Sequence, residues 1–234
     1  MSASCRWWRF GALGRAARLH AHAIADRDAG RLRSALYAAT NARRVVERRR
    51  GDSSPNAAVV WHTVGTIHEE LSDYGGADSA YRRAATILDS HRGDEALTPV
   101  RITVASSTAR LRRALGRLDD AERFYIQAIG LAERYYGTDA VEVALLLNDL
   151  AVVYKYAAWF DEAEALYRRA LPIIEATRGR GHVDVATIWH NLGGIEHAWG
   201  RFGTGEIYAR RAALPPRQTA DDLAVQRVST KRSG

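Results

Sequence analysis

The stretch Phe160-Asp-Glu-Ala-Glu-Ala-Leu-Tyr-Arg-Arg-Ala170 decides the fold, because Leu118-Asp-Asp-Ala-Glu-Arg-Phe-Tyr-Ile-Gln-Ala128 shows the same pattern 42 residues earlier. A fixed period of this size is typical of proteins built from stacked structural repeats. Each repeat in such a protein buries its apolar face against its neighbours, and the stack presents an extended surface that usually holds a partner. The period therefore predicts a repeat protein with a binding role.

Small residues carry the same period through most of the chain, in three columns whose members are 42, 44, 42 and 42 residues apart. The columns are Ala35, Ala77, Ala121, Ala163 and Gly205; Ala42, Ala84, Ala128, Ala170 and Ala212; and Ala23, Gly65, Ala109, Ala151 and Gly193. The two-residue insertion lies between Arg92 and Pro99. Because the residues between the columns vary freely, we expect the small positions to lie where helices approach closely.

Each unit is predicted to be a helical hairpin. In the fourth unit, residues 143–154 are rich in helix formers, and residues 161–175 place apolar side chains at the i, i+3, i+4 and i+7 spacing of a buried helix face. Asp161 follows the connecting turn and is expected to cap the second helix, as is Asp119 in the unit before. Large side chains are expected to fill the space beyond the small columns at Tyr81, Tyr125 and Tyr167.

These residues resemble the tetratricopeptide repeats of the longer, kinesin-light-chain type. The resemblance rests on the segments 147–154, 160–171 and 179–187, extends over residues 57–212 and is weaker over 13–50. It implies an all-α, right-handed solenoid of five helix-turn-helix repeats. It also implies that the inner face of the first helices holds extended peptides, with Asn148 and Asn191 contacting the peptide backbone.

The chain is predicted to form one domain, because a solenoid has no internal boundary. Residues 1–12 are expected to be an N-terminal segment and residues 215–234 a tail, with a short capping helix near Thr219 to Val228 and disordered residues after it. The predicted repeat units are 13–50, 57–92, 99–136, 141–178 and 183–214.

The chain of 234 residues has a formal net charge of +7, and ion pairs are expected to balance most of its arginines. Arg82, Arg168 and Arg210 each follow an acidic residue by four positions on a predicted helix, a spacing that forms surface pairs. The segment 43–50 and the tail 227–232 keep unbalanced arginines. Nucleic acid is therefore the alternative partner rather than the first expectation.

Polar residues on the first helices form the predicted binding face. They lie three residues before, one after and four after the small column that contains Gly65, so they share one side of each helix. At these positions the predicted groove contains His62, Thr66, Glu69, Ser106, Arg110, Arg113, Asn148, Val152, Lys155, His190 and His197, and the resemblance adds Asn191.

The centre of this face carries Arg110, Arg113 and Lys155, which favour a ligand with acidic residues or a free carboxylate. We predict a non-catalytic, protein-binding or peptide-binding scaffold or adaptor. The alternative is a regulatory protein whose arginine-rich segments contact nucleic acid.

Enzymatic, metal and cofactor chemistry are not expected. Cys5 is the only thiol and lies in a terminal segment, and the sequence has no glycine-rich phosphate loop. His62 and His68 are six residues apart, which places their rings on different faces of one helix, so no metal site is predicted. The single cysteine and the lack of a long apolar run favour a cytoplasmic protein without a membrane span.

Overall fold

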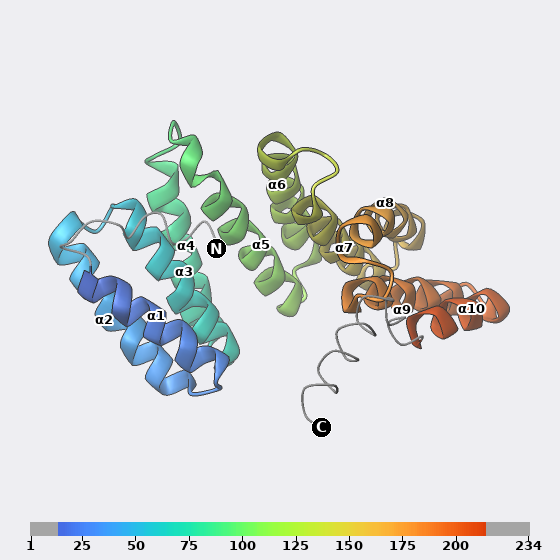
Figure 1. Cartoon of the computed structure of the whole chain (residues 1–234), viewed down its shortest axis with the longest axis horizontal. Helices are drawn as coiled ribbons and strands as arrows, with labels where there is room; N and C mark the ends of the chain where they lie inside the picture. The colour runs from blue at the N-terminus through green and yellow to red at the C-terminus, as the bar shows by residue number, and fades with distance from the viewer. Residues whose placement is uncertain (1–13, 214–234) are drawn as a thin grey trace, which may run out of the picture. The chain divides into compact units, whose positions relative to one another are not determined.

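The computed structural model describes residues 14–213, which form ten α-helices, one short 3-10 helix and no strand (Figure 1). The helices are α1 (Gly14–Asp28), α2 (Leu32–Arg50), α3 (Pro55–Glu70), α4 (Tyr74–Asp89), η3 (Glu95–Leu97), α5 (Thr98–Ala114), α6 (Leu118–Tyr136), α7 (Val141–Tyr156), α8 (Phe160–Arg178), α9 (Val183–Ala198) and α10 (Phe202–Ala213). The predicted N-terminal segment and capping helix of the tail lie outside the described residues. The all-α class is confirmed.

Consecutive helices pair into hairpins, as the sequence predicts: α1 with α2, α3 with α4, α5 with α6, α7 with α8 and α9 with α10. Contacts divide the chain into two compact units, residues 1–138 and 139–234. In unit 1, α2 packs on α3 and α4 packs on α5; in unit 2, α8 packs on α9. The expectation of one undivided domain stays a prediction.

The small columns lie where the helices of a hairpin come closest. Ala35, Ala77, Ala121 and Ala163 have no exposed surface. At Gly65, an added Cβ would lie 2.5 Å from a ring carbon of Tyr81, so this glycine lets α3 and α4 approach. The predicted tyrosine column is also confirmed, since all three of its members are fully buried: Tyr81, Tyr125 and Tyr167.

The turn inside each hairpin contains one residue in the left-handed region, again at the repeat period. Its φ lies between +60° and +73°, at Gly30, Ser72, Gly116, Ala158 and Gly200. Glycine adopts this conformation without steric cost, whereas a side chain makes it strained. Ser72 and Ala158 therefore carry backbone strain that the glycine turns avoid.

The caps of the second helices differ from the sequence prediction. Helix α8 is capped by Trp159 and α6 by Arg117, neither with a side-chain hydrogen bond, so Asp161 and Asp119 lie within the first turn instead. There their charges face the partial positive end of the helix dipole. The side chain that does cap a second helix is Asp73, which accepts a hydrogen bond of 2.9 Å from the backbone N–H of Gly76.

Candidate functional site

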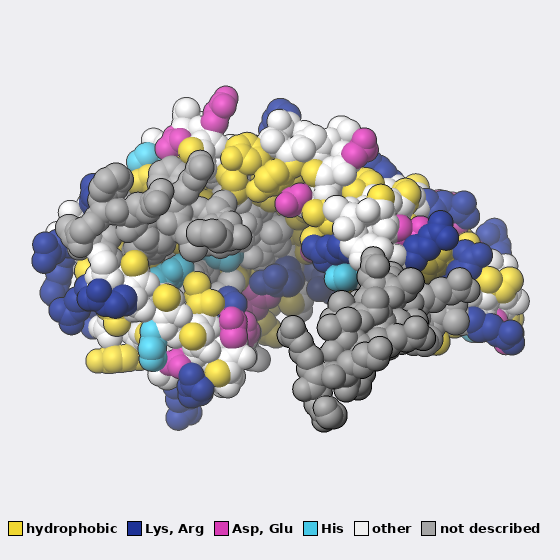
Figure 2. Space-filling view, in the orientation of Figure 1, with side chains coloured by type: hydrophobic (Ala, Val, Ile, Leu, Met, Phe, Trp, Pro, Cys, Tyr) yellow, Lys and Arg dark blue, Asp and Glu magenta, His cyan; other side chains and the backbone are white. Residues whose placement is uncertain are grey.

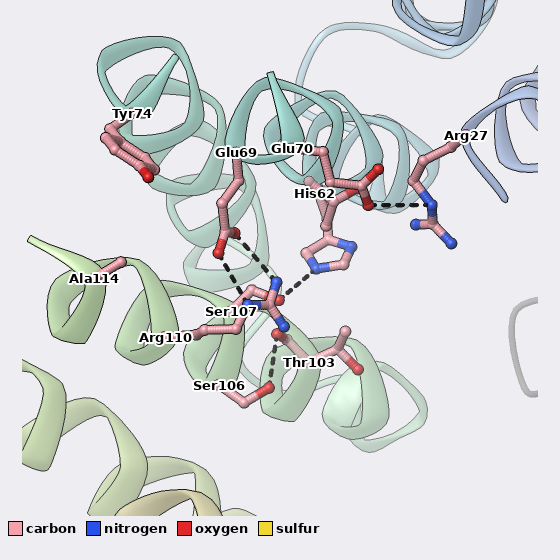
Figure 3. A pocket seen from close by; sticks show the side chains of 11 residues that line it. Arg27, His62, Glu69, Glu70, Tyr74, Thr103, Ser106, Ser107, Arg110 and Ala114 are labelled. Atoms are coloured by element: carbon pink, nitrogen blue, oxygen red, sulfur yellow. Dashed lines mark hydrogen bonds and ion pairs between the residues drawn. The ribbon is translucent and has the colours of Figure 1, made fainter. Parts of the chain in front are cut away.

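A polar pocket opens in unit 1 over the first helices of its three hairpins. Its volume is about 650 Å³, and α1, α3 and α5 supply most of its walls (Figure 3). The lining residues are Arg27, His62, Thr66, Glu69, Glu70, Tyr74, Thr103, Ser106, Ser107, Arg110 and Ala114. The structure thus brings together five of the predicted groove residues: His62, Thr66, Glu69, Ser106 and Arg110.

An ion pair between neighbouring hairpins crosses the pocket. The Nε of Arg110 lies 2.9 Å from Oε1 of Glu69 and its Nη2 lies 3.1 Å from Oε2, a bidentate arrangement that Figure 3 shows directly. The hydroxyl of Tyr81 donates to the same Oε2 at 2.8 Å. The hydrogen bond from Arg110 to Glu69 raises the pKa of the guanidinium, and burial together with the Glu69 charge raises the pKa of Tyr81. Glu69 therefore holds Arg110 in one orientation.

His62 joins α3 to α5 at the floor of the pocket. Its Nε2 lies 2.9 Å from Oγ of Ser107, and its ring stacks on Tyr81 with centroids 5.6 Å apart. Burial lowers the pKa of His62 to about 4, and the charges of Arg110 and Arg27 add to this shift. The ring is therefore neutral at pH 7, and both guanidiniums are close enough to act on it.

His20 repeats this arrangement one hairpin earlier, outside the pocket. Its Nε2 lies 2.8 Å from Oγ1 of Thr63, whose own proton goes to the carbonyl of Val59. This contact links α1 to α3, as the contact of His62 links α3 to α5. Burial lowers the pKa of His20 to about 4, with a smaller contribution from the charge of Arg27.

Arg27 enters the pocket from α1. Its Nη2 lies 2.7 Å from Oδ1 of Asp28, and its Nε lies 3.6 Å from Oε1 of Glu70. The remaining nitrogen, Nη1, donates to no residue in the described part of the chain, and the same holds for Nη1 of Arg110. The pocket thus has balanced charge, with two arginines and two glutamates, and keeps unused donors on both guanidiniums.

Arg113 was predicted in the groove but does not line this pocket; it lies on α5, half-buried. The sequence prediction missed Arg27, Glu70, Tyr74, Thr103 and Ser107. Arg27 occupies the same repeat position as Glu69, so the column that identified Glu69 identifies it as well. For Ser107, the signal is a hydroxyl at the same repeat position as Thr63.

In unit 2, Lys155 and Asn191 form one contact between first helices. The Nζ of Lys155 donates to Oδ1 of Asn191 at 2.8 Å, and burial lowers the pKa of the lysine. Asn148 lies half-buried on α7, and its Oδ1 is shielded from solvent without a hydrogen-bond partner among residues 14–213. Its amide nitrogen reaches Oδ1 of Asp149 at 3.4 Å.

The other predicted residues of unit 2 do not converge on one site. His190 lines a shallow cavity of about 390 Å³ between α9 and α10, whose other walls are mostly apolar. His197 is exposed, with its ring centroid 5.4 Å from that of Phe202, and Val152 is half-buried on α7. Over the described range, no three His, Cys, Asp or Glu side chains group as metal ligands, and no helix is long and apolar enough to span a membrane.

Comparison with known proteins identifies the repeats. The tetratricopeptide repeat family matches residues 101–171 and 160–213. Residues 101–213 of this chain are tetratricopeptide repeats. Their spacing of 42 residues agrees with the kinesin-light-chain-like type predicted from the sequence, and solved kinesin-light-chain-like repeat proteins share the fold. No curated protein matches the sequence.

Several solved structures share the fold of this chain. BtubC (BKLC) from P. vanneervenii is 22% identical, with 93% of both chains covered and a TM-score of 0.71. A kinesin-light-chain-like protein of P. anserina is 15% identical over 87% of this chain and 95% of that one, with a TM-score of 0.72. A Rap protein complexed with Competence and Sporulation Factor is 12% identical over 90% of this chain and 56% of that one, with a TM-score of 0.69.

Proposed function

We propose that this tetratricopeptide repeat protein is a non-catalytic scaffold or adaptor that binds an extended protein segment on the inner face of its first helices. The observation that carries the proposal is the pocket of unit 1, where side chains from α1, α3 and α5 converge without forming a catalytic arrangement. The repeat fold supports it, since stacked hairpins present extended binding surfaces. The Rap protein of similar fold, complexed with Competence and Sporulation Factor, supports it as well.

We further propose that the bound segment carries a carboxylate that reaches the unused edges of Arg27 and Arg110. Glu69 takes the Nε edge of Arg110 and leaves Nη1 open, so a ligand carboxylate accepts from Arg110 without displacing Glu69. Because Glu69 and Glu70 balance the two arginines, the attraction is short-ranged and depends on hydrogen-bond geometry rather than on net charge.

In unit 2, we propose that Asn148 and Asn191 contact the backbone of the same class of segment. An amide side chain both donates and accepts, as a peptide backbone requires. The half-buried position of Asn148 on α7 supports this role, because the residue keeps part of its surface exposed to a ligand. The neighbouring Lys155 already uses Oδ1 of Asn191, which leaves the amide nitrogen of Asn191 for the ligand.

A display library of random peptides, selected on the full chain, tests the proposal. We expect the selected peptides to be enriched in Asp, Glu or a free C-terminal carboxylate. Arg27→Gln should weaken them by about tenfold, the loss expected for one charge-assisted hydrogen bond. Arg134→Gln is the matched control, since Arg134 is exposed on α6 and outside the pocket. Peptides without acidic enrichment, or equal affinity for both variants, would contradict the carboxylate assignment.

A further inference from the structure

The first hairpin holds the whole charge excess of the protein. Residues 14–50 contain ten arginines and three acidic residues, a net charge of +7, which equals the formal net charge of the entire chain. The ion pairs of this hairpin use Arg27, Arg31 and Arg43. Within the described range, no partner is found for the other seven: Arg15, Arg18, Arg33, Arg44, Arg48, Arg49 and Arg50.

Three of these arginines lie on one stripe of α2. Arg33, Arg44 and Arg48 are spaced by 11 and 4 residues, so they fall within about 60° of one another around the helix. Tyr37 lies on the same stripe and is 73% exposed. The buried alanines and Val46 of α2 lie on the opposite side. The stripe is therefore solvent-facing along about 22 Å of helix. Figure 2 shows dark-blue Lys and Arg side chains gathered over the hairpin of α1 and α2.

Helix stability does not account for this arrangement. A positive charge at the C-terminal end of a helix interacts favourably with the helix dipole, and this accounts for Arg48. Arg33, however, lies in the first turn of α2, where a positive charge is unfavourable. The first turn of α2 has no acidic residue to compensate. The sole acidic side chain of α2, Glu47, is already bound to Arg43, whose guanidinium also lies 4.5 Å from the ring centroid of Trp61. The stripe thus keeps its charge unneutralised.

We propose that this stripe of α2 binds the sugar-phosphate backbone of a single nucleic-acid strand, with the ring of Tyr37 stacked on a base. Guanidinium groups bind phosphate oxygens bidentately, and phosphates recur along a strand as a linear series of charges. A basic track that carries an exposed aromatic ring is the combination that binds single strands without sequence preference. The site lies on a second helix and shares no residue with the pocket of unit 1.

Two other polyanions fit the stripe less well. An anionic membrane surface is bound by helices that combine a basic face with a broad apolar face, whereas the apolar residues of α2 face the core and Tyr37 is the exposed large hydrophobic residue of this helix. An acidic protein would have to present carboxylates at the spacing of three arginines on one line. A single nucleic-acid strand meets that spacing, because its phosphates recur regularly and its backbone is flexible.

Fluorescence anisotropy of the full chain with a labelled 20-mer of deoxythymidine tests the proposal. We expect a dissociation constant of about 1–10 μM at low salt, with a steep fall in affinity as salt rises. The triple variant Arg33→Gln, Arg44→Gln, Arg48→Gln should weaken binding by about tenfold or more and reduce the log–log salt slope by about 2. Tyr37→Ala should weaken binding by about fivefold or more and leave the slope unchanged.

The matched control removes three exposed arginines outside the first hairpin, by Arg82→Gln, Arg134→Gln and Arg168→Gln. It should change the affinity by less than about twofold, although it alters the net charge equally. Equal losses in both triple variants would overturn the proposal, because they would show that only net charge matters. Equally strong, stripe-dependent binding to phosphatidylserine vesicles or to polyglutamate would also overturn it. Tighter binding of a duplex than of the strand, with no effect of Tyr37→Ala, would overturn the stacking role.

Discussion

The imidazole of His62 on α3 and the hydroxyl of Ser107 on α5 connect two neighbouring hairpins through a 2.9 Å hydrogen bond. His20 and Thr63 make the equivalent connection between α1 and α3 at 2.8 Å. In both cases, a histidine of one repeat meets a hydroxyl of the next repeat. The hairpins of unit 1 are therefore linked by neutral histidines as well as by apolar packing.

These two histidines should make the stability of the protein pH-dependent. Each has a folded-state pKa of about 4, whereas an exposed histidine titrates near 6.5. Between these values the unfolded chain binds more protons than the folded one, so the free energy of unfolding falls as the pH drops from 7 to 4.5. We expect a loss of about 2 kcal/mol for each histidine, or about 4–5 kcal/mol for both, measured by urea unfolding across this range. In the double variant His20→Gln, His62→Gln the slope should flatten; an unchanged slope would assign it to other groups.

Replacing a helix glycine by alanine should change the stability of the protein in opposite directions at Gly65 and at Gly194, because the two positions differ in the space around them. Gly65→Ala should destabilise the protein by about 1–3 kcal/mol, because the new Cβ would lie 2.5 Å from the Tyr81 ring and force it to move. Gly194→Ala, in the interior of α9, meets no atom within 4 Å and should stabilise the helix by about 0.5–1 kcal/mol. Thermal unfolding measures both, and destabilisation by Gly194→Ala would contradict the packing at that face.

The turn of the fourth hairpin should be improved by glycine. Ala158 has a φ of +61°, whereas the equivalent Gly116 has +72°. Ala158→Gly should therefore raise the free energy of unfolding by about 0.5–1 kcal/mol, since it removes the strain of a left-handed alanine. Gly116→Ala is the converse control and should destabilise by a similar amount. If the two changes shift the thermal midpoint in the same direction, turn strain is not the dominant effect.

The repeat period was sufficient to predict the hairpins and their closest contacts. Columns of small residues mark positions where only a small side chain fits, so Ala121 and Ala163 could be assigned without a structure. The i, i+4 pairs on second helices could also be predicted from spacing, and all three are confirmed: Arg82 with Asp78, Arg168 with Glu164 and Arg210 with Glu206. The caps could not, because an aspartate near a helix start serves either as a cap or in the first turn, and the turn geometry decides.

The charge of the site could be predicted only in part. Arg110 was recognised as a groove residue, but its pairing with Glu69 depends on which faces of α3 and α5 meet. That relationship joins residues 41 positions apart, and no local pattern specifies it. The prediction of a net basic face was therefore incomplete, since it counted the arginine without its partner.

Glu69 should act as the anchor of the unit 1 pocket, because it accepts two hydrogen bonds from Arg110 and one from Tyr81. Glu69→Gln keeps the size of the side chain but removes its charge and one acceptor oxygen. We expect a loss of about 1 kcal/mol in the free energy of unfolding, a modest value because the side chain of Arg110 is 46% exposed. The pKa of Tyr81 should also fall, because the Glu69 charge helps to raise it, and ultraviolet titration of the phenol measures this.

Glu70→Gln is the matched control. Glu70 follows Glu69 on α3, but it lies 3.6 Å from Arg27 and its side chain is 47% exposed, so neither the free energy of unfolding nor the pKa of Tyr81 should change. Equal effects of the two substitutions would show that Glu69 contributes only as one more surface charge, and that Arg110 is held by something other than this carboxylate.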